Sequence, residues 1–231
     1  MTPRKTSRKK ASRGAVEPAQ SLTERAYEHL EEMIVTLQLP PGSAVSETLL
    51  SQRLGIGRTP IREALQRLAR ERLVTILPRR GIIVSEINVK TQLRLLEARR
   101  EVERLVAKSA ARRATAEERE HFLELARRFE KSARTNDDVA FMRVDREFNE
   151  FSVAAARNEF AAGAMSLMHS LSRRFWYIHY KQAADMPLTA KLHADIARAI
   201  GAGDETAAGK AMDKLLDAVA KFTRDTVTTD F

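Results

Sequence analysis

The chain contains no cysteine, and aromatic residues make up only 6% of its 231 residues. Without cysteine there are no disulfide bonds and no thiolate metal sites, which agrees with a protein of the reducing cytoplasm. No apolar run approaches the roughly 18 residues that cross a bilayer. The basic N-terminus is not followed by an apolar segment, so we expect no secretory signal. These absences argue against disulfide-stabilised secreted proteins and membrane-spanning proteins, and we expect a cytoplasmic one.

Glycine is also scarce, with 9 residues, which favours helix over most of the chain. With 43% hydrophobic and 31% charged residues, the composition is that of an ordinary globular protein. A chain of 231 residues has room for one large or two modest domains, each able to bury a core.

The formal net charge of +9 is unevenly distributed. Residues 1–86 hold 15 Lys and Arg against 9 Asp and Glu, a net of +6, whereas residues 87–231 hold 25 against 22, a net of +3. The basic excess therefore lies in the shorter N-terminal part, as expected if that part meets the phosphates of nucleic acid. Residues 1–20 carry six basic residues before the first acid, Glu17, and are predicted to be a disordered basic tail. The tail either adds salt-dependent affinity for phosphates or only solvates the chain.

Residues 46–72 have the pattern of two short helices joined by a tight turn. Ser46 begins the first helix, over 47–54. The second helix is predicted to start near Thr59, which can cap it, with Pro60 at the first helical position, where a missing N–H costs nothing. One face of the second helix is apolar and predicted to be buried; it carries Ile61, Ala64, Leu65 and Leu68.

The opposite face of this second helix carries Arg58, Arg62 and Gln66 at i, i+4 and i+8. Arginine can bond bidentately to guanine and glutamine to adenine, so this face is predicted to read base edges in the major groove. An ordinary solvated helix surface is the alternative when the helix is considered alone.

The segments on either side of the helix pair decide between these interpretations. A helix over 21–37, with the capping-box residues Ser21 and Glu24, comes before it. Two β-branched segments, LVTILP and IIVSEI, come after it and are joined by the basic tip Arg79-Arg80-Gly81. A hairpin directly after a recognition helix is a wing, whose tip can reach phosphates or the minor groove. The order predicts a winged helix-turn-helix DNA-binding domain over 21–86.

Residues 87–231 are patterned as helix almost continuously. We expect helices near 88–113, 116–134, 137–157, 159–181, 188–202 and 204–227. Their Ala- and Leu-rich faces alternate with charged faces, which predicts an antiparallel helical bundle. The predicted fold class is mostly α, with an N-terminal winged helix-turn-helix and a C-terminal all-helical bundle.

The segment PPGSAVSETLLSQRLGIGRTPIREALQRLARERLVTILPRRGIIV closely resembles the DNA-binding domain of GntR-type bacterial repressors, and RTPIREAL is its sharpest part. Within that family the chain looks like the FadR-like branch, which adds an all-helical (FCD-type) domain for effector binding and dimerisation. The resemblance implies operator contacts by Arg58, Thr59 and Arg62, with Gly81 at the wing tip. Some members carry a basic DNA-contacting residue where this chain has Thr48, so we expect the contact at Thr48 to differ.

In the bundle the resemblance rests on EARREVE (97–103), DREFN (145–149) and HADIARAIGAGD (193–204). It implies that Arg99 pairs with an acidic effector, since the arginine fork suits a carboxylate. A salt bridge within its own helix is the alternative role for Arg99.

The metal-binding members of the family have four ligands, and this chain matches two of them, Asp145 and His193. Asn149 stands where those members have a histidine, and Leu215 stands where they have the last one. One interpretation is a zinc- or nickel-type divalent metal held by Asp145, Asn149 and His193 and completed by water or an effector carboxylate. In the other interpretation Asp145 and His193 are polar groups of a ligand pocket.

One further stripe in the bundle combines polar and aromatic residues. His169, Arg173, Trp176 and Tyr180 recur at helical spacing and either line an effector cavity or belong to plain core or a dimer interface. The chain has no HExxH motif, no Gly-rich phosphate loop and no nucleophile elbow, so we do not expect an enzyme.

Together these features predict a homodimeric transcriptional regulator that binds a palindromic operator, one half-site per protomer. A small organic acid in the bundle is expected to change the placement of the two winged helices. The sign, repression relieved by ligand, rests on the family resemblance. Two other classes stay open: an architectural DNA-binding protein with a filled bundle and no effector, and a metal-dependent enzyme fused to a DNA-binding domain.

Overall fold

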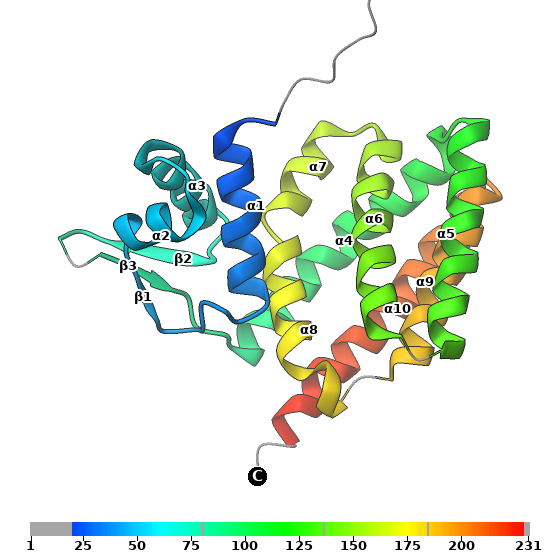
Figure 1. The fold of residues 1–231 in the computed structure, drawn as a ribbon. Coiled ribbons are helices and arrows are strands. Elements are labelled where there is room, and N and C mark those ends of the chain that lie inside the picture. The colour runs from blue at the N-terminus through cyan, green and yellow to red at the C-terminus, as the bar shows by residue number, and fades with distance from the viewer. Residues whose placement is uncertain (1–19, 80, 136, 184, 229–231) are drawn as a thin grey trace, which may run out of the picture.

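A computed structural model describes residues 20–79, 81–135, 137–183 and 185–228 of the chain. Over these residues the chain forms ten helices and three short strands, with a winged helix-turn-helix followed by a helical bundle (Figure 1). The predicted mostly α fold is confirmed. Residues 1–19 of the predicted tail, and Arg80 at the predicted wing tip, lie outside the described residues.

The N-terminal part combines three helices with a small antiparallel sheet. The helices are α1 (Leu22–Val35), α2 (Glu47–Leu54) and α3 (Arg58–Arg70), and the strands are β1 (Ala44–Val45), β2 (Val74–Leu77) and β3 (Gly81–Val84). The strand order is β1-β3-β2. The predicted wing is the β2–β3 hairpin, in which Val74 lies opposite Val84 and Leu77 opposite Gly81. Strand β1 was not predicted, because two residues are too few to show alternation; it pairs with Ile82 and Ile83 of β3.

The starts of the three helices test the predicted caps. Ser21 caps α1 as expected, with the Glu24 backbone N–H donating to its Oγ at 3.1 Å. Ser46 is at the N-cap of α2 but makes no side-chain capping bond. The prediction that Thr59 caps α3 is wrong: Gly57 is the N-cap, and Thr59 lies inside the first turn. Pro60 is still tolerated there, because the first-turn N–H groups have no partner within the helix.

The predicted apolar stripe of α3 forms the centre of the N-terminal core. Ile61, Ala64, Leu65 and Leu68 are each at most 1% exposed, and they pack with residues of α1 such as Leu30 and with Val84 of β3. Burying an aliphatic side chain of this size is worth about 1.5–3 kcal/mol, so this core fixes α3 on α1.

The C-terminal part contains the other seven helices. They are α4 (Val89–Arg113), α5 (Ala116–Thr135), α6 (Asp138–Ala156), α7 (Glu159–Ser166), α8 (His169–Ala183), α9 (Met186–Gly201) and α10 (Glu205–Thr228). Helix α9 packs against α5 and α10, and α10 packs against α4. Their core joins aromatic residues such as Phe122, Phe129 and Phe148 with small alanines, which let the helices approach closely.

The single helix predicted over 159–181 is wrong, because the chain forms α7 and α8 there. The break lies at Leu167 and Met168, whose N–H groups donate to Ala164 and Met165 in tight i→i+3 bonds. Met165 and Met168 are both buried, and the turn between the two helices lets both enter the same small core. The break contains neither glycine nor proline, so no breaker residue marked it.

Helix α8 of the C-terminal part packs against the N-terminal part of the molecule. It lies beside α1 (Figure 1), and Leu171 on α8 packs against the N-terminal core. No helix in the described part of the chain combines the length and the apolar character that crossing a membrane requires.

Candidate functional site

The first candidate site is the outer face of α3. Arg58, Thr59, Arg62 and Gln66 are all exposed, and the buried stripe of the same helix holds this face outward. Thr48, at the start of α2, is half-buried. The geometry is that of a recognition helix presented to a groove. The individual base contacts remain predictions.

Arg62 has a partner that the sequence did not reveal. Its guanidinium forms a bidentate ion pair with Glu47 of α2, with Nη2 2.8 Å from Oε2 and Nε 3.1 Å from Oε1. The hydrogen bond from Arg62 holds the pKa of the Glu47 carboxyl below its usual range. Because Arg62 remains 61% exposed, the pair orients the arginine without hiding it. The Glu47 carboxylate bonds to Nε and Nη2 only, and base contact by Arg62 stays a prediction.

The wing lies on the same side of the molecule as α2 and α3 (Figure 1). Arg79 is exposed in its turn and has φ 61°, and Gly81 begins β3 with φ 96°. The positive φ at Gly81 suits glycine, which has no Cβ to clash. The phosphate-contacting role predicted for Arg79, Arg80 and Gly81 stays a prediction.

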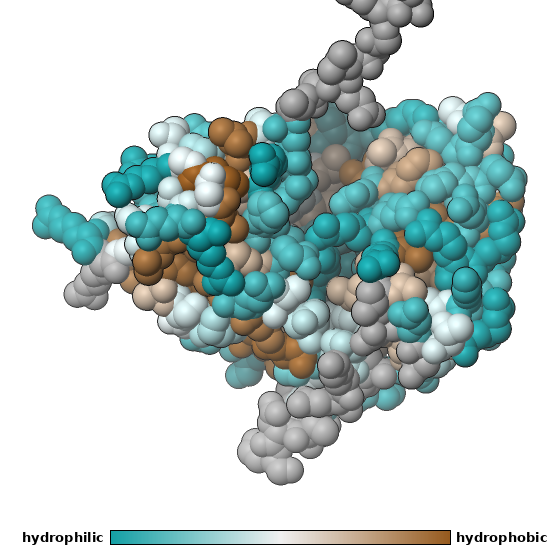
Figure 2. All heavy atoms as spheres, in the orientation of Figure 1, coloured by the Kyte–Doolittle hydropathy of each residue, from teal (hydrophilic) through white to brown (hydrophobic). Residues whose placement is uncertain are grey.

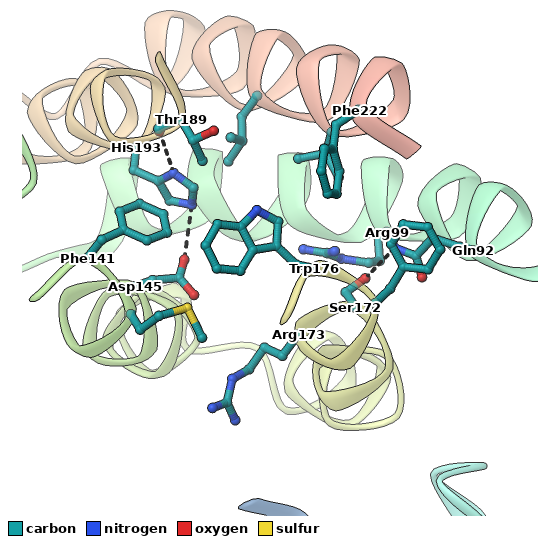
Figure 3. Close-up of a pocket in the computed structure, with 14 residues that line it drawn as sticks. Gln92, Arg99, Phe141, Asp145, Ser172, Arg173, Trp176, Thr189, His193 and Phe222 are labelled. Atoms are coloured by element: carbon teal, nitrogen blue, oxygen red, sulfur yellow. Dashed lines mark hydrogen bonds and ion pairs between the residues drawn. The ribbon is translucent and has the colours of Figure 1, made fainter. Parts of the chain in front are cut away.

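The second candidate site is a cavity of about 80 Å³ inside the bundle (Figure 3). We call it the effector cavity, after the effector site that the sequence resemblance implies for the bundle. Helices α4, α6, α8, α9 and α10 line it. Its apolar walls are Phe141, Met142, Phe175, Trp176, Leu215, Val219 and Phe222. Its polar groups are Gln92, Arg99, Asp145, Ser172, Arg173, Thr189 and His193. An apolar hollow with a few converging polar groups is the usual form of a small-molecule site.

Asp145 and His193 meet at the wall of the effector cavity, as Figure 3 shows. His193 Nδ1 is 2.8 Å from the Thr189 carbonyl oxygen, which can only accept, so Nδ1 carries a hydrogen. His193 Nε2 then faces Asp145 Oδ1 at 3.1 Å. Burial alone would raise the pKa of Asp145, but the hydrogen bond and charge of His193 hold it below its usual range. The pair is therefore anchored on one side by Thr189, and its carboxylate and imidazole both border the cavity.

Asn149, the third predicted ligand, does not line the effector cavity. Its amide nitrogen donates to the backbone oxygen of Asp145 at 2.8 Å and to Asp145 Oδ1 at 3.1 Å. Leu215 presents an apolar wall. Within the described residues no three His, Cys, Asp or Glu side chains gather closely enough to hold a metal ion. Two protein donors are fewer than the three or four of known zinc sites, so this donor set does not fit a tightly held divalent metal.

The comparisons with known proteins agree with both halves of this geometry. Residues 22–84 match the bacterial regulatory proteins of the gntR family, and residues 94–218 match the FCD domain. The chain belongs to the gntR family of transcriptional regulators and carries an FCD domain. DNA binding and transcription regulation follow from that membership.

Individual relatives share the whole architecture. The HTH-type transcriptional repressor RspR of Escherichia coli is 27% identical over 210 residues, 90% of this chain and 91% of RspR. The Nta operon transcriptional regulator of Aminobacter aminovorans is 28% identical over 71% of this chain and 76% of its own. Among solved structures, E. coli McbR/YncC covers 90% of this chain and 99% of its own with a TM-score of 0.77 and 18% identity, which shows a common fold.

In the FCD domain of this chain, Arg99 makes the salt bridge within its own helix that was its alternative role, and its pairing with an acidic effector stays a prediction. Arg99 lines the effector cavity, and its Nε donates to Glu103 Oε1 at 3.0 Å within α4. Glu103 is only 5% exposed, so its buried carboxylate holds the guanidinium of Arg99 in place. An arginine held in this way still has N–H groups for a ligand, because its guanidinium carries five.

The predicted stripe on α8 divides between two sites. Arg173 and Trp176 line the effector cavity, whereas Tyr180 stacks on Trp176, with ring centroids 4.6 Å apart, and does not line it. His169 lines a separate recess between α1 and helices α6 and α7, which also borders Arg173. Figure 2 shows this recess as a hollow on the viewed face.

Several cavity residues were missed by the sequence reasoning. Phe141 and Thr189 come four residues before Asp145 and His193, so helical spacing could have found them. Gln92 and Ser172 had no such signal. The Gln92 amide donates to the Ser172 hydroxyl at 3.2 Å across 80 residues of sequence.

Proposed function

We propose that this gntR-family regulator is a repressor that binds a palindromic operator as a homodimer and releases it when a small organic acid fills the effector cavity. The observation that supports the proposal best is the effector cavity itself. It places Arg99, the side chain of Arg173 and the Asp145–His193 pair around a mostly apolar space. An architectural protein would have no use for such a space, and a filled core would be more stable without it.

The lining of the effector cavity narrows the class of ligand. Four aromatic rings, those of Phe141, Phe175, Trp176 and Phe222, and several aliphatic side chains suit an apolar body. Arg99 suits a carboxylate, because its fork can bond to both oxygens. The Asp145–His193 pair suits a hydroxyl or carbonyl group of the same ligand. We propose a monocarboxylic acid with a short apolar body and no requirement for a metal.

The DNA half of the proposal rests on the recognition helix. Arg58, Arg62 and Gln66 read bases, Thr59 supports them, and the wing contacts phosphate. Two protomers related by a two-fold axis present two such helices, so the operator is an inverted repeat. The repressor sign is supported by relatives: RspR and GlaR of E. coli, the latter 31% identical over 87 residues, are both described as transcriptional repressors.

Two measurements test this function. Selection of bound fragments from a random DNA pool should yield an inverted repeat, and a selected sequence without a repeat would contradict the dimeric mode of reading. Thermal unfolding with acetate, pyruvate, 3-hydroxybutyrate and benzoate should identify an acid that stabilises the protein. At a hundred times its Kd such an acid stabilises by about 2.7 kcal/mol, or about 5–11 °C. Arg99→Gln should abolish that shift, whereas the same shift in Arg99→Gln would exclude Arg99 as the carboxylate partner.

A further inference from the structure

Arg173 belongs to the effector cavity and to the contact with the DNA-binding domain at the same time. Its side chain lines the cavity, but Figure 3 shows its guanidinium turned away from Asp145 and His193. The guanidinium instead contacts α1, where Nη1 donates to Glu31 Oε1 at 2.9 Å. The two side chains are 13% and 6% exposed, so this ion pair is largely removed from water.

The carboxylate of Glu31 depends on Arg173. The only other cation within ion-pair distance of it among the described residues is Arg146, at 3.7 Å. Its neighbour Glu32 differs, because Glu32 is 48% exposed and has Arg146 as its nearest cation at 3.1 Å, with Arg173 farther away at 3.7 Å. A buried carboxylate that loses its nearest cation is strongly destabilised, whereas an exposed one is not. Glu31 is therefore the sensitive member of this network, and Glu32 is its matched control.

The Glu31 end of the pair is rigidly connected to the recognition helix. Helix α1 shares its apolar core with α3. The guanidinium of Arg67 on α3 also stacks on the ring of Tyr27 on α1, with Arg67 Cζ 3.5 Å from the ring centroid. The residue after Arg173 holds the same domain from another side. Arg174 is 2% exposed and donates to the carbonyl oxygens of Ser85 at 2.9 Å and Glu86 at 3.2 Å, just after β3. Helix α8 thus fixes the winged helix at two points.

We propose that a carboxylate bound in the effector cavity takes the guanidinium of Arg173 away from Glu31, and that loss of this ion pair releases the winged helix from α8. The inference rests on the proposed effector function and specifies its regulation. Rotation of the Arg173 side chain, which borders both the effector cavity and the recess, moves the guanidinium from Glu31 to the carboxylate in the cavity. Glu31 is then left beside the recess, which has a volume of about 390 Å³ and can admit water. Hydration of Glu31 loosens the contact between α1 and α8 and hence the placement of α3.

Competition for one guanidinium has a reciprocal consequence. If acid binding must break the Arg173–Glu31 pair, then a protein without the pair binds the acid more tightly, because the free energy of breaking the pair is no longer subtracted from binding. Couplings of this kind typically amount to about 5–150-fold. The full-length Glu31→Gln variant, which keeps the shape of the side chain but not its charge, is the direct test.

Calorimetric titration with the four acids named above should be done on wild type, Glu31→Gln and the control Glu32→Gln. We expect Glu31→Gln to bind the stabilising acid at least about fivefold more tightly, and Glu32→Gln to match wild type. Equal affinity in all three proteins would agree with the proposed effector function but contradict the proposal that the acid breaks the Arg173–Glu31 ion pair. If none of the acids bound to any of the proteins, the proposed function itself would fail.

Arg173→Gln gives a second test that needs no ligand. If Arg173 served only to bind the acid, this variant would hold the selected operator as tightly as wild type and would merely ignore the acid. The proposal instead predicts operator affinity at least about fivefold weaker than wild type, in the absence of any acid. Wild-type operator affinity in Arg173→Gln would therefore contradict it, even if Glu31→Gln failed to fold.

Discussion

Lowering the pH should begin to destabilise the helical bundle well above the pH at which carboxylates titrate. His169 should be the main cause. Burial lowers the pKa of His169 from 6.5 to about 4, and the charges of Arg99, Arg173 and Arg146 act in the same direction, against the opposing carboxylate of Asp145. The folded protein therefore keeps this imidazole neutral. The unfolded chain takes up a proton as the pH falls through about 6.5, so stability decreases between about pH 6.5 and pH 4.

The size of the effect follows from the shift. The slope is about 1.4 kcal/mol per pH unit, so between pH 8 and pH 5 the bundle should lose roughly 2 kcal/mol through His169. For a domain of this size that corresponds to about 4–8 °C in Tm. Asp145 does not interfere. Its folded pKa is lowered, so the stability that it contributes is lost only as the pH falls through that lowered value, below this window.

Urea unfolding followed by the fluorescence of Trp176, the only tryptophan, measures this loss in the bundle. His169→Gln should remove most of the pH 8 to pH 5 difference, whatever its effect at pH 8. The exposed His29 on α1 provides the control, since His29→Gln should keep the wild-type difference. An equal loss in wild type and His169→Gln would refute the reasoning.

Other predictions test the two candidate sites. Arg62→Ala should cost about 1–3 kcal/mol in binding to the selected operator and less on random DNA; equal losses would make Arg62 a phosphate contact. Deletion of residues 1–20 should weaken binding to all DNA sequences and reduce the salt slope, and an unchanged slope would show that the tail takes no part. Zinc and nickel should not raise the Tm of wild type, but zinc should raise that of Leu215→His, which adds a third donor beside Asp145 and His193. Metal stabilisation of wild type would show that a site exists without it.

The fold could be predicted largely because the strongest signals are local. The apolar stripe of α3 and the basic hairpin after it lie within a few turns of sequence, and both occur in the structure. The misses have equally local reasons. Strand β1 is only two residues long, and the break between α7 and α8 contains no glycine or proline. Gly57 took the cap position predicted for Thr59, because either residue can precede a first turn that contains Pro60.

The candidate site was less predictable because its decisive contacts are distant in sequence. Asp145 and His193 could be selected in advance, and they do meet. Nothing local indicated that Arg173 would pair with a glutamate 142 residues away, or Arg62 with Glu47 across the turn. Charged residues on helix surfaces are common in this chain, so a partner can be assigned only when tertiary packing brings two of them together.

The most direct test of the regulatory account is fluorescence anisotropy of the full-length protein on its selected operator, with and without the stabilising acid. We predict that saturating acid weakens operator binding at least about fivefold, while binding to DNA of random sequence changes little. Operator affinity that stays the same while the acid demonstrably occupies the protein would contradict the claim that the effector cavity controls the recognition helix.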